Sequence, residues 1–205
     1  MYADIDPIQV GTVKIGLISS FGIEIKQSEV PVIFNPRTGY AYLDFFQDLT
    51  TYHQYWDGPG RQALINAIER YKTDYEARNL NLGRAKARRV YGTIEGFADW
   101  GNIKSMLNNR GYPKINLGYT FHKDSPYFTI TQQETKNTKV PDGANAGSSG
   151  YVVIYFTRSM AEDLAALFNQ DYLMSQLPAY ARPSSASGTE DAPLPPVNGI
   201  QPDVY

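Results

Sequence analysis

The sequence predicts an α+β protein in which a ββββα unit occurs twice, with one amphipathic helix in each unit and a disordered C-terminal tail. Several stretches with strand-like alternation precede a helical stretch, and the same order then repeats. Related strings, Gly11-Thr12-Val13 and Gly92-Thr93-Ile94, open the two passes. From Pro183 onward the chain is rich in proline, serine and glycine, a composition that cannot build a packed core.

The first half contains four expected strands and one helix. In the opening strand Val13, Ile15 and Leu17 alternate with polar or small residues, which is typical of a strand with one buried face. Residues 50–60 are expected to form a loop that ends in Asp57-Gly58-Pro59-Gly60, because proline fits the first turn of a helix. An apolar stripe at helical spacing then runs along residues 61–79. The four expected strands cover residues 12–19, 23–26, 30–34 and 40–46.

The second half follows the same order. Residues 88–100 alternate as one strand, and their glycines favour a bulge or a bend. Ser159 followed by Glu162 matches a capping box at the start of the second amphipathic helix. The other expected strands cover residues 115–123, 127–135 and 151–157. We therefore expect one domain over residues 1–182, made of two pseudo-repeats (about 11–82 and 84–177), and a tail over 183–205.

Composition narrows the class of protein. A chain of 205 residues with 42% hydrophobic residues can bury a real core. The absence of cysteine excludes disulfides and thiolate metal sites, and it fits a reducing compartment. The N-terminus does not resemble a signal peptide, and no stretch approaches the roughly 20 apolar residues that cross a bilayer. With two histidines and no catalytic or nucleotide-binding motif, we expect a cytoplasmic protein that is not an enzyme and uses no metal or other cofactor.

The charge of the chain is unevenly distributed. The net charge is −2, yet residues 84–123 contain eight basic and two acidic residues, a local net charge of +6. Aromatic residues are interleaved with these cations. Single-stranded nucleic acid is held by this combination, with cations at the phosphates and rings stacked on the bases. The residues that we expect to contact nucleic acid are Arg84, Lys86, Arg88, Arg89, Tyr91, Trp100, Lys104, Arg110, Lys114 and Tyr119.

Other interpretations of the same residues stay open. The rings can fill the core while the cations form a solvated edge that discourages strand pairing, and the protein is then a non-enzymatic interaction or assembly protein. An enzyme acting on a small polar substrate is a third alternative. The tail, whose charged residues are all acidic and which ends on Tyr205, either docks on the basic surface or on a protein partner, or only solubilises the chain. We expect a homo-oligomer and no membrane partner.

The doubled ββββα order resembles the Whirly family and related PUR-type proteins. The likeness includes the passage from the last strand into the second helix, Tyr155-Phe156-Thr157-Arg158-Ser159-Met160-Ala161-Glu162-Asp163-Leu164, and it covers roughly residues 11–177. These families bind single-stranded DNA or RNA. The resemblance implies two antiparallel sheets, helices packed between or beside them, assembly through the helices, and bases laid across outward sheet faces. The lysine-rich strand motif of plant Whirly proteins is not visible, so the expected contact residues are chosen by their own chemistry.

Overall fold

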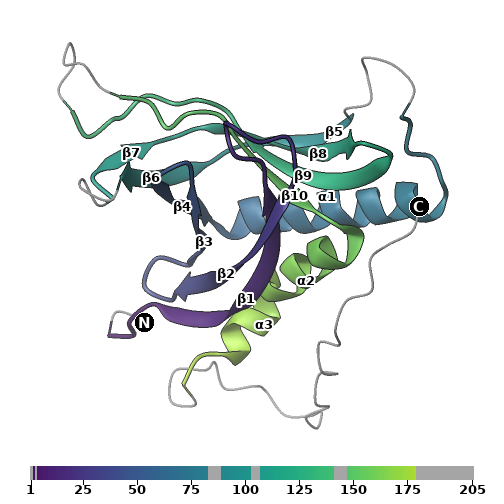
Figure 1. Cartoon of the computed structure of the whole chain (residues 1–205). Coiled ribbons are helices and arrows are strands. Elements are labelled where there is room, and N and C mark those ends of the chain that lie inside the picture. The colour runs from purple at the N-terminus through teal and green to yellow at the C-terminus, as the bar shows by residue number, and fades with distance from the viewer. Residues whose placement is uncertain (1, 3, 83–88, 103–106, 141–146, 179–205) are drawn as a thin grey trace, which may run out of the picture.

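The computed structural model describes residues 2, 4–82, 89–102, 107–140 and 147–178. Its main feature is one ten-stranded antiparallel sheet that curves around the helices as a half-barrel (Figure 1). The strand order is β5-β8-β9-β10-β1-β2-β3-β4-β6-β7. The elements are β1 (Ile8–Leu17), β2 (Lys26–Asn35), β3 (Tyr40–Gln47), β4 (Thr50–Trp56), α1 (Gly58–Glu76), β5 (Arg89–Glu95), β6 (Phe97–Asn102), β7 (Asn109–Gly111), β8 (Lys114–His122), β9 (Ser125–Gln132), β10 (Val152–Phe156), α2 (Arg158–Phe168) and α3 (Gln170–Ser175).

The prediction of a duplicated ββββα unit with two separate sheets and two helices is wrong. One sheet takes strands from both halves of the chain, because β1 pairs with β10 and β4 pairs with β6. The described part of the second half contributes six strands against four from the first, and a third helix follows α2. The expected strand over 23–26 belongs mostly to the connection between β1 and β2. The predicted tail over 183–205 lies outside the described residues.

The alternating run over 88–100 is two strands rather than one, and they occupy distant places in the strand order. β5 pairs with β8, whereas β6 pairs with β4 and β7. The break falls at Gly96, whose N–H donates to the Pro113 carbonyl at 2.7 Å. A Cβ atom on residue 96 would lie 2.3 Å from Ile115 Cδ1, so any side chain there would clash. Glycine at this position therefore lets the chain leave one strand and enter the other.

Gly96→Ala is expected to lower the free energy of unfolding by about 1–3 kcal/mol, because the side chain of Ile115 would have to move within a packed core. Gly92→Ala is the matched control, since a Cβ atom on residue 92 of β5 would have nothing within 4 Å. Urea unfolding of both variants measures the difference. Equal losses in the two variants would contradict this role for Gly96.

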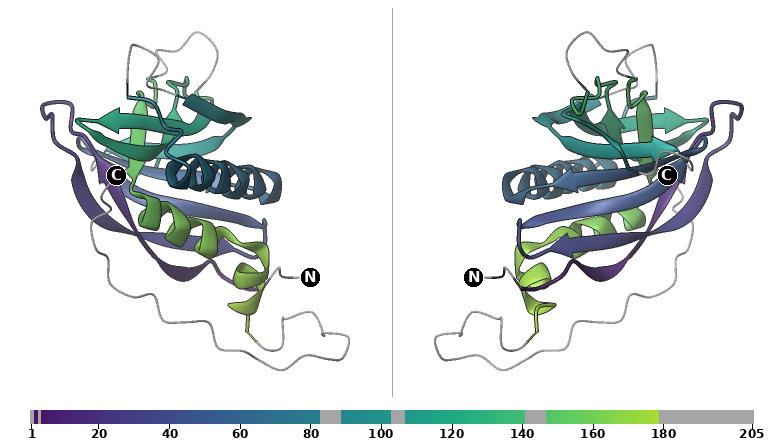
Figure 2. Two further views of the ribbon diagram at one scale, coloured as in Figure 1. Left: turned by 90° about the vertical axis from the view of Figure 1, so that its right-hand side faces the viewer. Right: turned by 90° about the vertical axis from the view of Figure 1, so that its left-hand side faces the viewer.

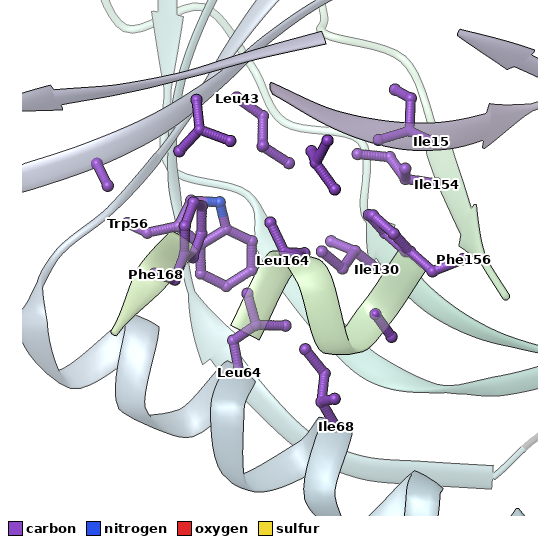
Figure 3. Close-up of a cluster of buried hydrophobic side chains, with 14 of the residues drawn as sticks. Ile15, Leu43, Trp56, Leu64, Ile68, Ile130, Ile154, Phe156, Leu164 and Phe168 are labelled. Atoms are coloured by element: carbon purple, nitrogen blue, oxygen red, sulfur yellow. The ribbon is translucent and has the colours of Figure 1, made fainter. Parts of the chain in front are cut away.

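The helices cover one face of the sheet, and the core lies between the two layers (Figure 2). Figure 3 shows Ile15, Leu43 and Ile130 on the strands pointing toward Leu64 of α1 and Leu164 of α2, and all five side chains are fully buried. None of the described helices is long and apolar enough to span a membrane.

Helices α1 and α2 each begin with a side-chain cap. Asp57 accepts a hydrogen bond from the Gly60 N–H at 2.7 Å, and Pro59 lies in the first turn of α1, as the sequence predicts. For α2 the cap is Thr157, whose hydroxyl accepts from the Met160 N–H at 3.3 Å, and not the Ser159 of the predicted capping box. The sequence thus locates the second helix but misplaces its first residue.

The two outermost strands, β7 and β5, form hydrogen bonds with other parts of the chain. The Arg110 carbonyl of β7 accepts from the Thr138 N–H at 2.7 Å, and the Arg110 N–H donates to Asn137 Oδ1 at 3.1 Å. At the opposite end of the strand order, the Tyr91 carbonyl of β5 accepts from Arg70 Nη1 at 3.0 Å. The segment that follows β9 is therefore bound to β7, which helps to roll the sheet into its half-barrel form.

Candidate functional site

The sheet face opposite the helices carries a continuous group of aromatic side chains. On β3, Tyr40 and Tyr42 alternate with the buried Ala41 and Leu43, so the two tyrosines project from the outer face. β4 and β6 add further rings at equivalent positions because these strands pair side by side. We call this group the aromatic row, and its members are Tyr40, Tyr42, Tyr55, Phe97 and Tyr112.

Neighbouring rings of the aromatic row contact one another. Tyr55 and Phe97 stack with their centroids 4.6 Å apart, and Phe97 and Tyr112 stack at 5.7 Å. Tyr42 lies 4.9 Å from Tyr55, and Tyr40 meets Tyr55 edge-on at 6.3 Å. Tyr112, at the end of the row, is 62% exposed, whereas the other four rings are half-buried. The stacked rings of Tyr55, Phe97 and Tyr112 therefore cover part of one another's faces, and Tyr112 is the ring of the row most open to solvent.

An ion pair underlies the row. Arg110 donates from Nε to Asp99 Oδ1 and from Nη2 to Asp99 Oδ2, both at 2.8 Å, and its guanidinium lies 4.7 Å from the Phe97 ring centroid. The Asp99 side chain is only 7% exposed, and Lys139 Nζ lies 3.9 Å from Asp99 Oδ1. The hydrogen bonds to Asp99 raise the pKa of Arg110 above its usual value. Two cations thus surround one buried carboxylate beside the rings.

Two phenols of the row, those of Tyr42 and Tyr55, have a raised pKa. Tyr55 donates to Asp99 Oδ2 at 3.5 Å, and its hydroxyl lies 3.4 Å from His53 Nδ1. Burial raises the pKa of Tyr55, and the negative charge of Asp99 raises it further. Burial also raises the pKa of Tyr42, with a smaller contribution from Asp44. These groups can therefore donate hydrogen bonds well above neutral pH.

The raised pKa of Tyr55 predicts a loss of stability in alkali. Its stabilising contribution is present below about pH 10, where the unfolded tyrosine ionises, and is lost as the pH rises toward the folded-state value. The free energy of unfolding should therefore fall above about pH 10, and Tyr55→Phe should make that fall smaller. Urea unfolding near pH 8 and near pH 11 measures both. An identical pH dependence in the variant would argue against the shift.

The structure separates the predicted contact residues into three groups. The rings of Tyr91, Trp100 and Tyr119 are 8%, 5% and 4% exposed, so they belong to the core and offer no accessible stacking face. Arg110 lies at the aromatic row, and Lys114 is exposed at the start of β8. Outside the described residues lie Arg84, Lys86, Arg88, Lys104 and the side chain of Arg89.

The rings of the first half are absent from the predicted contact residues. The strand pattern that could have revealed them lies in residues 50–56. There Tyr52, Gln54 and Trp56 are buried, and the alternate residues His53 and Tyr55 face outward. This stretch, expected as a loop, is β4. Among the described residues, no group of three or more histidine, aspartate or glutamate side chains could hold a metal ion.

The fold and this face define an α+β protein with one curved antiparallel sheet, helices on one side and an aromatic surface with a buried ion pair on the other. The chain belongs to the family described as "Uncharacterised Treponema protein", whose model matches residues 7–175. A protein of Treponema pallidum (strain Nichols), described as "Uncharacterized protein", is 25% identical over 191 residues, which cover 93% of this chain and 67% of that protein. No solved structure matches the chain significantly.

Proposed function

We propose that this protein is a non-catalytic binder of single-stranded DNA or RNA and that bases stack on the aromatic row. The observation that carries the proposal is the stacked series Tyr55, Phe97 and Tyr112 with Arg110 against its central ring. Every base has a flat aromatic face, and stacking on a protein ring is worth roughly 1–3 kcal/mol per base. Because the rings of this series stack on one another, the exposed ring of Tyr112 at its end is where we expect a base to extend the stack.

In this proposal the phosphates meet the cations that border the row. Arg110 uses two of its five N–H donors on Asp99, which leaves others for a phosphate oxygen. Lys139 Nζ lies 3.9 Å from Asp99 Oδ1, and Lys114 follows Tyr112 by two residues in the sequence. Lys104 and the basic run Arg84 to Arg89, whose last residue begins β5, are further phosphate contacts in this proposal. A cytoplasmic location, a homo-oligomer and a partner for the tail are parts of the same proposal.

A second candidate function is protein interaction, and the tips of two hairpins favour it. Phe21 is 100% exposed, Ile23 80% and Leu49 69%. Asp48 joins the two tips, because its carboxylate accepts from the Ser20 hydroxyl at 2.6 Å and from the Ser20 N–H at 3.1 Å. Leu49 has φ of 68°, a costly conformation for a bulky residue. Exposed apolar side chains gathered at two joined hairpin tips are typical of a surface that contacts a partner.

Fluorescence anisotropy with labelled single-stranded oligonucleotides separates the two functions. For nucleic-acid binding, the logarithm of the affinity should fall linearly with the logarithm of salt concentration, with a slope near −0.7 for each phosphate contact. An absence of binding at low salt, or binding indifferent to salt, would refute the proposal. A defined oligomer in light scattering with no affinity for oligonucleotides would favour protein interaction.

A further inference from the structure

The outer face of the sheet also contains a groove at some distance along the strand order from the aromatic row. Two hollows of about 330 Å³ and about 460 Å³ adjoin at Tyr151, Val153 and Tyr155, which line both, and we call the two hollows together the groove. The first hollow lies over β5, β8, β9 and β10, and the second extends toward the hairpin turns near residues 18–20 and 47–50. Both volumes lie in the range of ordinary ligand sites, about 300–1,000 Å³.

The register of the strands explains the first hollow. Gly118 on β8 pairs with Val90 on β5 at one side and with Thr129 on β9 at the other, and Thr129 pairs in turn with Tyr155 on β10. Because Gly118 has no side chain, it forms a floor between flanking side chains. Val90, which is 55% exposed, and the Tyr155 ring stand at the two sides of this floor.

Hydrogen-bonding groups without partners line the groove. Within the described part of the chain, the side chains of Thr120, Thr129, Thr131 and Gln133 make no hydrogen bond, although all four line the first hollow. Thr129 as a residue is 5% exposed, but its hydroxyl keeps contact with solvent. A bound ligand can therefore replace hydrogen bonds between these side chains and water with hydrogen bonds to its own polar groups. The groove is thus prepared to donate and accept several hydrogen bonds.

The groove carries almost no charge. Among its described lining residues, the first hollow has no ionisable acid or base apart from tyrosine, and the second has only Asp48. The Asp48 carboxylate already accepts hydrogen bonds from Ser19 and Ser20. Among the described lining residues, a phosphate or a carboxylate would therefore meet no cation, and a cationic ligand would meet no anion other than Asp48. Uncharged ligands rich in hydroxyl groups fit this chemistry.

We propose that the groove binds a neutral carbohydrate. A sugar ring presents hydroxyl groups at its edge and apolar C–H groups on its faces. The edge meets Thr129, Thr131 and Gln133, while a face packs against the ring of Tyr155 over the floor at Gly118. The two adjoining hollows give room for more than one sugar unit. The proposal is independent of nucleic-acid binding, because it uses none of the residues of the aromatic row.

Calorimetry and NMR with maltohexaose, cellohexaose and hexa-N-acetylchitohexaose test this proposal. At least one of these neutral oligosaccharides should bind with Kd of about 1 mM or tighter. The methyl resonances of Val90, Thr131 and Val153 should shift, since these side chains line the first hollow. Failure of all three to bind, or shifts confined to residues outside the groove, would overturn the proposal.

Variants of the groove sharpen the test. Thr131→Val keeps the shape of the side chain and removes the hydroxyl, so it should weaken binding about two- to twelve-fold. Thr51→Val is the matched control, because Thr51 is a half-buried threonine on β4 that lines neither hollow. Gln133→Ala, at a half-buried amide, provides a second groove variant if Thr131→Val fails to fold. Equal affinity in the control and both groove variants would refute the assignment.

Discussion

Replacing Phe97 and Tyr112 together with alanine is expected to weaken binding of single-stranded oligonucleotides by about five-fold or more. A base stacked on the exposed ring of Tyr112 contributes at least about 1 kcal/mol, and Phe97 supports that ring by stacking against it. Losing this stacking position therefore costs at least about 1 kcal/mol, which corresponds to a change in Kd of about five-fold. The change also removes the ring on which the Arg110 guanidinium rests, so that cation would be less well oriented toward a phosphate.

Tyr151→Ala is the control for this double variant. Tyr151 is 54% exposed on the same chain and is not a member of the aromatic row, so its removal tests whether any exposed tyrosine has the same effect. Anisotropy titrations of the two proteins at one low salt concentration give the comparison, and thermal unfolding shows whether each remains folded. Wild-type affinity in the double variant would rule out the aromatic row as the binding surface.

Arg110→Ala is expected to reduce the free energy of unfolding by about 3 kcal/mol. The variant would leave the Asp99 carboxylate, 7% exposed, without its two strongest donors. Breaking a buried ion pair costs about 3–5 kcal/mol, and the lower end applies because Arg110 is 40% exposed and Lys139 remains 3.9 Å from the carboxylate. Asp99→Ala combined with Arg110→Ala should recover part of the loss, since no unpaired buried charge remains.

Arg37→Ala provides the comparison for Arg110→Ala. Arg37 pairs with Asp6, whose side chain is 87% exposed, and exposed pairs contribute at most about 1 kcal/mol. Chemical denaturation of the two single variants and of the double variant gives the required free energies. A loss in Arg110→Ala no greater than that in Arg37→Ala would show that the buried ion pair does not organise this face.

The sequence predicts elements whose pattern is local. The alternation in β1 and β3, the hairpin of β8 and β9, and the position of Pro59 in the first turn of α1 are confirmed. β4 is missed because the turn before it, at Asp48 and Leu49, adopts positive φ without the glycine or asparagine that usually marks such a turn. The division of residues 88–100 is missed because alternation continues through Gly96, and alternation does not specify the partner of a strand.

The candidate site depends on contacts that no local pattern encodes. The aromatic row joins residues 40–55 with residues 97–112 through the pairing of β4 with β6. A bulge between Val90 and Gly92 shifts the register of β5, so Val90 is 55% exposed and Tyr91 is buried. A shift of one residue reverses the face of every side chain that follows. For this reason, the aromatic residues of the basic region could be predicted as strand residues but not assigned to a face.

The capped outer strands affect how the protein behaves in a concentrated solution. An uncapped edge strand offers free N–H and C=O groups to another chain and so promotes aggregation by strand addition. Here the three-residue strand β7 is already bonded to Asn137 and Thr138, and β5 uses the Tyr91 carbonyl to accept from Arg70. The sheet is therefore poorly suited to grow from one molecule to the next. Any self-association should use side-chain surfaces, which leaves the backbone pairing of each molecule intact.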